Sequence, residues 1–330
     1  MSADTINIEN RLVETTNLPR FTEIFNLCFG ITVSESYFKW KYLQNPAGQV
    51  IAYETINTDT NEVGAFYGII PEEYMINGER KVIYQSMDTM THPNYRNRGL
   101  FIKLANLTYD YTFKELGTLK LIGIPGSNSY HGFVNKLHWK NPHNFSYIFQ
   151  HRMLIKMRGL FSKPTVELEQ ISVFDDETDL FFSTKKYYKS AYKVYNKEVL
   201  NWKISNHPFH KFISYKVKKD NVIIGLVILQ KEDNNNLKIV YADFLDNDQR
   251  LYLKETIMAI TSKISFKYIY TWEPTDNVLI SQYKKAMFLK NPFKRGIFSY
   301  KVPLILLTRD GDADFWENPD NVELQPIIQD

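Results

Sequence analysis

A tryptophan–lysine pair followed by a proline occurs twice in this chain of 330 residues. The first copy is Trp40, Lys41 and Pro46, and the second copy is Trp202, Lys203 and Pro208. Each member of the second copy lies 162 residues (202 − 40) after its counterpart, and a strand-like run follows both copies. An ordered series of matches at one spacing indicates an internal duplication. We therefore expect two similar domains, 1–160 and 161–330, which meet near residues 158–175.

Within each half, runs with the two-residue period of strands alternate with runs that have the helical period of 3.6 residues. In the first half we expect strands at 51–55, 63–76 with an interruption at Pro71, 81–91, 119–124 and 145–157, and helices at 18–29, 101–116 and 129–137. In the second half we expect strands at 212–217, 222–230, 238–245, 268–272 and 297–307, and helices at 180–195, 248–262 and 277–286. The chain after Asp310 is expected to be irregular. This alternation predicts an α/β fold, a mixed sheet with flanking helices.

Three local details follow from residue types. Asn77-Gly78 predicts a two-residue hairpin of type I′ character, and Gly117 stands where a glycine ends a helix. In the helix that precedes Gly117, the apolar spacing places Phe113 on the buried face.

The composition excludes several classes of protein. Hydrophobic residues make up 44% and charged residues 23% of the chain, which is typical of globular proteins. The net charge is +3 (40 − 37), too small for a basic field that recruits nucleic acid. The single cysteine, Cys28, cannot form an internal disulfide. No signal peptide, membrane span or metal-ligand spacing is visible. We expect a cytoplasmic protein, monomeric or homodimeric, without a metal, nucleic-acid or membrane partner.

One segment carries a chemical signal. A strand over 87–91 runs into a turn that contains Arg96, Asn97, Arg98 and Gly99, and a helix follows at once. The first N–H groups of a helix have no internal partner, and with the helix dipole they bind anions. Arginines add charged contacts to phosphate, and a glycine lets an anion approach the backbone. The alternative is an ordinary strand-to-helix turn with solvated arginines.

The same segment resembles the pyrophosphate loop of the GNAT superfamily of acyl-CoA-dependent N-acyltransferases, Gln/Arg-x-x-Gly-x-Gly/Ala. Arg96 and Gly99 match it, whereas Phe101 stands where the family prefers a small residue. The preceding His92-Pro93-x-Tyr95 resembles the family's strand end. The resemblance implies acyl-CoA as co-substrate, bound by Met90, Thr91, Arg96, Asn97, Arg98, Gly99, Leu100, Phe101 and Asn128. It also implies that a backbone N–H between Thr89 and Thr91 polarises the thioester carbonyl.

Residues 128–139 resemble the helix that follows the family's fifth strand. Val134 stands where that helix often has the tyrosine that protonates the leaving thiolate, so Tyr130, one helical turn earlier, is the substitute candidate. For the base that accepts the amine proton, the candidates are His131 and Asp88. Each also has a structural alternative, because Asp88 could pair or cap, and a single histidine such as His131 could simply pack.

The full chain resembles bacterial tandem-GNAT proteins, in which the first half binds acyl-CoA and the second half lacks the loop. Here Asp246 to Arg250 stands at the loop position of the second half, too acidic to hold a pyrophosphate. The resemblance implies acetyl or 3-hydroxybutyryl transfer to a nucleotide-linked amino sugar, such as a dTDP-3-amino-3,6-dideoxyhexose, for surface polysaccharide (O-antigen) synthesis. Two alternatives remain: a peptidoglycan-type aminoacyl transferase that uses aminoacyl-tRNA, and a non-catalytic CoA- or peptide-binding module.

Overall fold

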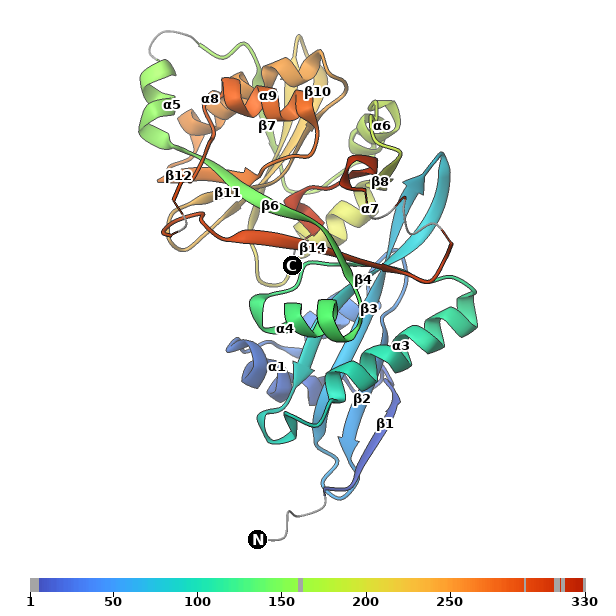
Figure 1. Ribbon diagram of the computed structural model, residues 1–330. Coiled ribbons are helices and arrows are strands. Elements are labelled where there is room, and N and C mark those ends of the chain that lie inside the picture. Colours follow the sequence, from blue (N-terminus) through green and yellow to red (C-terminus); the bar gives the residue numbers. More distant parts are fainter. Residues whose placement is uncertain (1–5, 160–162, 294, 312–314, 316–317, 329–330) are drawn as a thin grey trace. The chain divides into compact units, whose positions relative to one another are not determined.

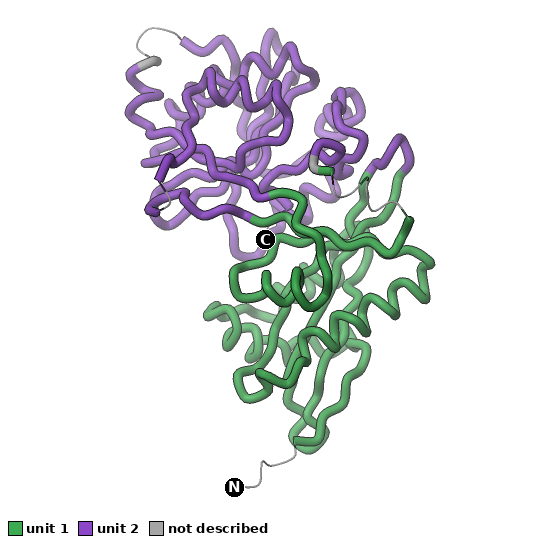
Figure 2. The backbone as a smooth tube through the Cα atoms, in the orientation of Figure 1, with its two compact units in different colours: residues 1–74, 80–143, 303–318 green, residues 75–79, 144–302, 319–330 purple. Residues whose placement is uncertain are grey.

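A computed structural model describes residues 6–159, 163–293, 295–311, 315 and 318–328. The chain divides into two compact units, shown in separate colours in Figure 2. Unit 1 comprises residues 1–74, 80–143 and 303–318, and unit 2 comprises residues 75–79, 144–302 and 319–330. The expected domain junction at 160–161 lies outside the described residues.

Unit 1 is a mixed sheet with helices (Figure 1). Its strands lie in the order β1 (Ile8–Leu12), β2 (Ile51–Asn57), β3 (Val63–Ile76), β4 (Glu79–Thr91), β5 (Lys120–Gly123) and β14 (Lys301–Thr308). The pair β4–β5 is parallel, whereas β1–β2, β2–β3 and β5–β14 are antiparallel. The helices are α1 (Phe21–Phe29), α2 (Glu35–Phe38), α3 (Leu100–Leu116) and α4 (Ser127–His131), with the short turns η1 (Leu18–Arg20), η2 (Lys39–Leu43), η3 (Pro93–Tyr95) and η4 (Gly132–Lys136).

Unit 2 has a second mixed sheet. Its strands lie in the order β6 (Lys140–His151), β12 (Tyr268–Trp272), β11 (Leu237–Phe244), β10 (Val222–Lys231), β9 (Phe212–Lys219) and β7 (Glu167–Ile171). Its helices are α5 (Arg152–Gly159), α6 (Asp176–Thr184), α7 (Lys197–Leu200), α8 (Leu253–Lys263) and α9 (Asn277–Lys285), with η5 (Asn201–Ser205), η6 (Gln249–Tyr252), η7 (Pro319–Asn321) and η8 (Pro326–Ile328). The α/β class with mixed sheets and flanking helices is confirmed.

The sequence repeat corresponds to a structural repeat. Trp40 lies in the π-helical turn η2 and Trp202 in the π-helical turn η5, and only 4% and 6% of their surfaces are exposed. Each turn follows a short α-helix and precedes a strand. From there, β2, β3, β4, α3 and β5 of unit 1 have the same order as β9, β10, β11, α8 and β12 of unit 2.

The strand β3 is continuous, so the expected interruption at Pro71 was wrong. Pairing with β2 stops at Ile69, opposite Ile51. Pro71 therefore lies beyond β2, and its missing N–H interrupts no bond to that strand. The Pro71 carbonyl accepts a hydrogen bond from the Asn45 side chain at 2.8 Å.

Local turn chemistry was predicted correctly. Asn77 and Gly78 have φ angles of 51° and 85°, the left-handed pair that a type I′ turn requires. Gly117 ends α3 with a φ of 69°. Phe113, however, is exposed, and α3 buries Thr108 and Thr112 instead. Both threonine hydroxyls donate to the carbonyl four residues earlier, which lets a polar side chain be buried.

Two element boundaries were wrong. The helix expected over 180–195 is α6, which starts earlier, at a capping box on Asp175, and ends at Thr184. The chain then forms β8 (Ala191–Lys193). The strand expected over 145–157 ends at His151, and α5 follows. The tail after Asp310 is not wholly irregular, since β15 (Val322–Glu323) pairs with β8.

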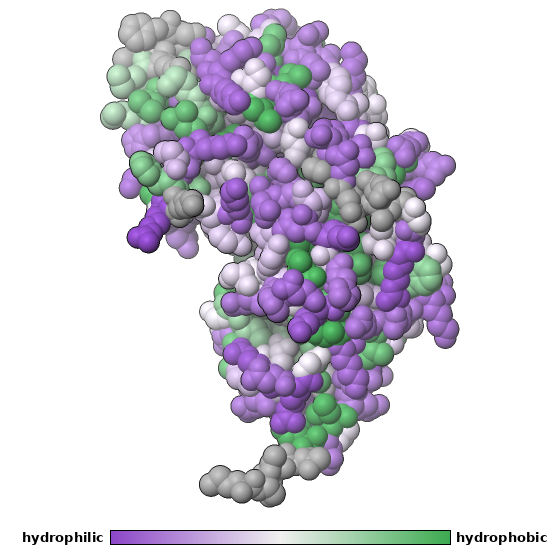
Figure 3. Space-filling model, viewed as in Figure 1, coloured by the Kyte–Doolittle hydropathy of each residue, from purple (hydrophilic) through white to green (hydrophobic). Residues whose placement is uncertain are grey.

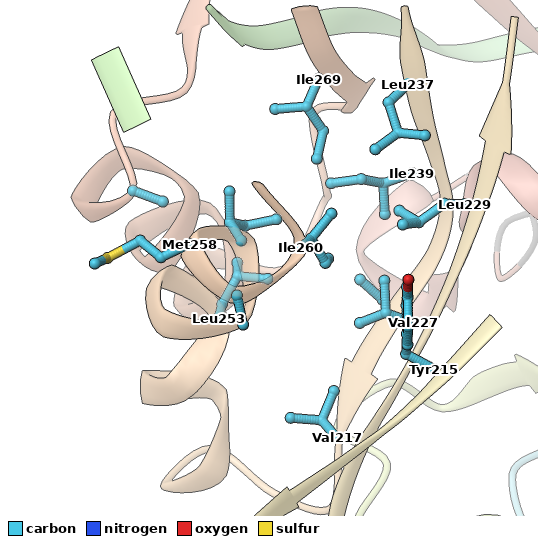
Figure 4. Close-up of a cluster of buried hydrophobic side chains, with 14 of the residues drawn as sticks. Tyr215, Val217, Val227, Leu229, Leu237, Ile239, Leu253, Met258, Ile260 and Ile269 are labelled. Carbon is cyan, nitrogen blue, oxygen red and sulfur yellow. The ribbon is translucent and has the colours of Figure 1, made fainter. Parts of the chain in front are cut away.

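Each unit has its own hydrophobic core. In unit 2, α8 packs its apolar side on strands β9 to β12; Figure 4 shows Leu253 and Ile260 facing Val227, Leu229 and Ile239. The face in Figure 3 is mostly hydrophilic. In the described part of the chain, no helix combines the length and apolar character needed to cross a membrane.

Candidate functional site

The turn between β4 and α3 presents backbone N–H groups to open space. Gly99 caps α3 with a φ of 71°, and a Cβ placed there would meet no atom within 4 Å. The first bond inside the helix joins Lys103 N to Gly99 O at 3.1 Å, so the amides before Lys103 have no helical partner. The first turn of α3 has no acidic residue, and Arg96 and Arg98 are exposed beside it. The geometry fits an anion such as a diphosphate.

Buried contacts hold this turn in place. The Tyr95 ring packs so closely on Gly64 that a Cβ there would lie 2.7 Å from the ring. The Tyr95 hydroxyl donates to Glu62 at 2.7 Å and accepts from the Asn57 side chain at 2.9 Å. His92 Nδ1 accepts from the Asn94 amide at 3.2 Å. His92 therefore shapes the turn. These contacts fix the backbone that leads into the exposed residues after Tyr95.

The strands β4 and β5 separate next to this turn. Their parallel pairing consists of Tyr84 with Leu121 and Gln85 with Ile122. Residues 86–91 of β4 continue beyond the end of that pairing, where the amides between Thr89 and Thr91 were expected to act. Such a gap between neighbouring parallel strands can admit an extended chain such as the pantetheine of CoA.

Asp88 bends β4 inside this gap. Its φ of 45° is left-handed, a conformation that Asp tolerates better than most residues. One carboxylate oxygen accepts from Lys41 Nζ at 3.0 Å and the other from the Tyr42 hydroxyl at 2.7 Å. Lys41 is 2% exposed and also donates to the Tyr37 hydroxyl. With both oxygens engaged, Asp88 is better placed to hold the bend in β4 than to accept a proton from an amine.

The structure does not bring the two base candidates together. Tyr42, which holds Asp88, stacks on Phe66 of β3. Tyr67, the next residue of β3, points to the opposite face, in the cluster that includes Tyr130 of α4. Asp88 therefore lies on one face of the sheet, whereas α4, which carries Tyr130 and His131, packs on the other.

On α4, Asn128 and His131 are exposed and Tyr130 is half-buried. The Tyr130 hydroxyl accepts a hydrogen bond from the Asn141 side chain at 2.8 Å, so its own proton remains available for donation. Phe101, the bulky residue in the loop, packs against Gly132, where a Cβ would lie 2.4 Å from its ring. Because Gly132, the first residue of η4, has no side chain, the Phe101 ring of α3 fits against it.

A chain of hydroxyls ends at the gap, and sequence reasoning missed it. Trp139 Nε1 donates to the Tyr109 hydroxyl at 3.1 Å, Tyr109 and Tyr67 are 2.8 Å apart, and Tyr67 donates to Ser86 at 2.9 Å. Because Tyr67 donates its single proton to Ser86, Tyr109 must donate to Tyr67, and the Ser86 proton is left for another acceptor. Ser86 directly follows Gln85, the last β4 residue that pairs with β5.

The two tyrosines in this chain stay protonated. Burial raises the pKa of Tyr67 and of Tyr109 well above the usual value for tyrosine. They can therefore relay hydrogen bonds but not act as bases. Sequence offered no signal for them, since tyrosines on an apolar strand and helix face are predicted as packing residues.

Unit 2 has the same separation of strands. β11 and β12 pair through Leu237 with Ile269 and Lys238 with Tyr270. If Leu237 is taken as equivalent to Tyr84, then Asp88 corresponds to position 241, a tyrosine, and Thr89 corresponds to Ala242.

In unit 2 the chain's own residues occupy this place. The Ala242 N–H donates to the Gln325 side chain at 2.9 Å. Asp243, fully buried, pairs with Lys185 at 2.9 Å and Arg250 at 3.1 Å. Burial opposes the charged form of Asp243, but these two cations hold its pKa below the ordinary value. The space that remains beside Asp243 and Gln325 is a cavity of about 30 Å³.

Comparisons with known proteins agree with this picture. Residues 9–134 match the family model described as an acetyltransferase (GNAT) domain. No curated protein matches the chain by sequence. A GCN5-related N-acetyltransferase from Anabaena variabilis is similar in structure over 91% of this chain and 72% of that chain, with a TM-score of 0.63 and 14% identity. A probable N-acyltransferase from Enterococcus faecalis covers the same shares, with a TM-score of 0.66 and 10% identity.

Saccharomyces cerevisiae N-myristoyltransferase, solved with bound myristoyl-CoA, is also similar. The match covers 92% of this chain and 80% of that chain, with a TM-score of 0.58 and 12% identity. Residues 9–134 are therefore similar to a GNAT acetyltransferase domain, and the chain has the fold of these GNAT structures.

Proposed function

We propose that this protein is an acyl-CoA-dependent N-acyltransferase with two GNAT-like units in tandem. Unit 1 binds acyl-CoA, and unit 2 shapes the site for the acceptor amine. One observation carries the proposal: the gap beyond Gln85 lies beside a turn that is open in front of Gly99, whereas Gln325 occupies the equivalent gap of unit 2.

The residues of unit 1 divide the binding of acyl-CoA among them. The first amides of α3 and the guanidinium groups of Arg96 and Arg98 hold the diphosphate. Asn97 and Asn128 contribute polar groups near it, and Leu100 anchors the helix in the core. Met90, Thr91 and Phe101 are the remaining residues that we propose to contact acyl-CoA. The amides between Thr89 and Thr91 donate to the thioester carbonyl as it gains negative charge.

Two proton transfers need a group from the protein. The leaving thiolate needs a donor because Val134 has no hydroxyl. The Tyr130 hydroxyl is one candidate, and Ser86 is a second because its proton is not used in the hydroxyl chain. His131 is the candidate base for the amine, since its imidazole is exposed on α4 and histidine is the most frequent general base.

The proposed acceptor is a small amine, most specifically a nucleotide-linked amino sugar. The support is the resemblance of the whole chain to tandem-GNAT proteins that modify such sugars. A free-thiol assay with acetyl-CoA and 3-hydroxybutyryl-CoA against nucleotide amino sugars, other amines and aminoacyl-tRNA tests it. Thiol release that depends on a nucleotide amino sugar supports the proposal. Transfer that occurs only with aminoacyl-tRNA contradicts it.

A pair of histidine variants tests the base. We expect His131→Asn to lower kcat/KM about 10²–10⁴-fold and to remove the acidic limb of the pH–rate profile. His138→Asn is the matched control, because His138 is also exposed and its left-handed φ of 58° suits asparagine. A fall of less than about threefold for His131→Asn, with an unchanged acidic limb, removes His131 as the base.

A further inference from the structure

The strand β4 contains a left-handed residue in its interior. Asp88 has a φ of 45°, and the strand continues beyond it to Thr91. Asp88 also lies beyond Gln85, the last residue of β4 that pairs with β5. A left-handed residue within a strand redirects the peptide groups that follow it. Asp88 therefore sets the direction of the amides between Thr89 and Thr91.

Two of these amides face the gap between the strands. The N–H of His92, the residue after β4, donates to the Gly64 carbonyl of β3 at 2.9 Å. Because successive residues of a strand direct their N–H and C=O groups to opposite edges, Thr91 and Thr89 turn theirs away from β3. The Thr91 carbonyl agrees with this direction, since it accepts a hydrogen bond from Arg96 Nε, outside β3, at 3.4 Å. The N–H groups of Thr89 and Thr91 are thus directed to the edge of β4 from which β5 separates.

Two neighbouring side chains of η2 hold the Asp88 carboxylate. Lys41 Nζ donates to one oxygen at 3.0 Å, and the Tyr42 hydroxyl donates to the other at 2.7 Å. The Lys41 side chain is 2% exposed and the Asp88 side chain 8% exposed. Lys41 also donates to the Tyr37 hydroxyl of α2 at 3.0 Å. Because charge-assisted hydrogen bonds are strong and both oxygens are bound from one turn, η2 fixes the orientation of Asp88.

The corresponding strand of unit 2 is built differently. β11 also has an irregularity, because Ile228 lies opposite Tyr241 whereas Leu229 lies opposite Ile239. No residue of β11, which the structure describes in full, has a positive φ. The counterpart of Asp88 is Tyr241, whose ring packs against other aromatic rings. The left-handed bend and the carboxylate that accompanies it therefore belong to the unit whose gap is open.

We propose that Lys41 and Tyr42 are positioning residues for acyl transfer. Through Asp88 they hold β4 in the bend that directs the Thr89 and Thr91 amides at the thioester oxygen as it gains negative charge. Donors that are preorganised in this way stabilise the transition state more than the ground state. Neither side chain touches the substrate or exchanges a proton with it. This role rests on the proposed function, because only an acyl-CoA presents that oxygen.

Infrared spectroscopy of bound acetyl-CoA, isotope-labelled at the thioester carbonyl, tests this role without an acceptor. In the wild type we expect the carbonyl band to move to lower frequency on binding, because hydrogen-bond donors weaken the C=O bond. Tyr42→Phe keeps the ring that stacks on Phe66 and removes only the hydroxyl, and we expect it to lose at least about half of that movement. Lys41→Met should lose more, since it removes the charged partner of Asp88.

Calorimetry with free CoA separates positioning from a merely structural role. CoA has no acyl carbonyl, so its affinity should stay within about threefold of the wild-type value in every folded variant. Tyr215→Phe is the matched control, because it removes the hydroxyl of a buried tyrosine in unit 2. This control should keep both the position of the carbonyl band and the affinity for CoA.

A pair of variants at Asp88 distinguishes positioning from proton transfer. Asp88→Gly and Asp88→Ala both remove the carboxylate, but only glycine adopts a left-handed φ without strain. We expect Asp88→Gly to keep more of the band movement than Asp88→Ala and to exceed it in kcat by at least about tenfold. If Asp88 acted as a base, the two variants would be equally impaired.

Each failure has a separate meaning. A wild type that does not bind CoA contradicts the proposed function, and the positioning role falls with it. A wild type that binds CoA but leaves the carbonyl band of acetyl-CoA unmoved overturns the positioning role alone. The same holds if the band moves in the wild type and moves equally in folded Tyr42→Phe and Asp88→Ala.

Discussion

The two units contain the same separation of parallel strands, yet only one of them leaves it open. In unit 1, β4 and β5 part after Gln85, and the turn that follows exposes Arg98 and Gly99. In unit 2, β11 and β12 part after Lys238, and Gln325 accepts the hydrogen bond of the Ala242 amide. A shared backbone therefore does not make a shared site, because side chains and distant segments decide what occupies the gap.

The clearest difference between the two gaps is the exposure of the nearby arginine. Arg98 is exposed, whereas Arg250 is 2% exposed and bonds to Asp243 and Asp276. The Arg98 guanidinium is accessible to a ligand, whereas the Arg250 guanidinium forms ion pairs within the protein. Two units with the same order of elements can therefore use an arginine differently, one leaving it exposed and the other burying it in internal ion pairs.

The largest effect is expected at Arg250. Arg250→Met leaves Asp243 buried with one cation fewer, so the free energy of unfolding should fall by about 3–5 kcal/mol. Arg98→Met, at an exposed position, should change it by less than about 0.5 kcal/mol but weaken CoA binding. Urea denaturation and calorimetry measure both. Equal stability of the two variants would mean that the Asp243 cluster does not stabilise unit 2.

The second prediction tests whether the open turn before α3 binds CoA. Gly99→Val adds a side chain where CoA would approach and should weaken CoA binding at least about 100-fold, as expected when close backbone approach is lost. Gly117→Val is the matched control, since Gly117 has the same left-handed φ and open surroundings at the other end of α3. Both variants carry similar strain, so equal CoA affinity in the two would show that the turn is not the site.

The smallest effect is expected at Gln325. Gln325→Leu removes the acceptor of the Ala242 N–H and should lower the free energy of unfolding by about 1–3 kcal/mol, the cost of an unsatisfied buried donor. Gln49→Leu, in an exposed loop, is the control. Calorimetry should still show a single CoA equivalent. A second bound CoA would mean that the segment around Gln325 excludes CoA from unit 2. The absence of an Arg-x-x-Gly loop in unit 2 would then not be the cause.

Much of the fold could be predicted because it depends on local preferences. The type I′ turn at Asn77 and Gly78 and the glycine end of α3 follow from which residues tolerate positive φ. The repeat of Trp40 at Trp202 predicted two similar halves because it marks the same turn in each. The errors at Pro71 and Phe113 arose where a neighbouring strand ended or a threonine bonded its own helix, which a residue's type does not reveal.

The candidate site was only partly predictable. The loop around Gly99 was visible in the sequence, since strand, turn and helix are continuous in the chain. Asp88 was singled out as a base, but its carboxylate meets Lys41, 47 residues away. The hydroxyl chain to Ser86 spans strands and a helix, and no periodicity marks it.

The sequence by itself determined the duplicated α/β pattern, the turns and the position of a helix start beside two arginines, because these depend on neighbours along the chain. Only the tertiary structure decided which gap stays open, since Gln325 reaches Ala242 across 83 residues. It also decided that Arg250 is buried and Arg98 exposed. Burial and pairing between distant residues depend on how whole elements pack, and that information is not contained in any one segment.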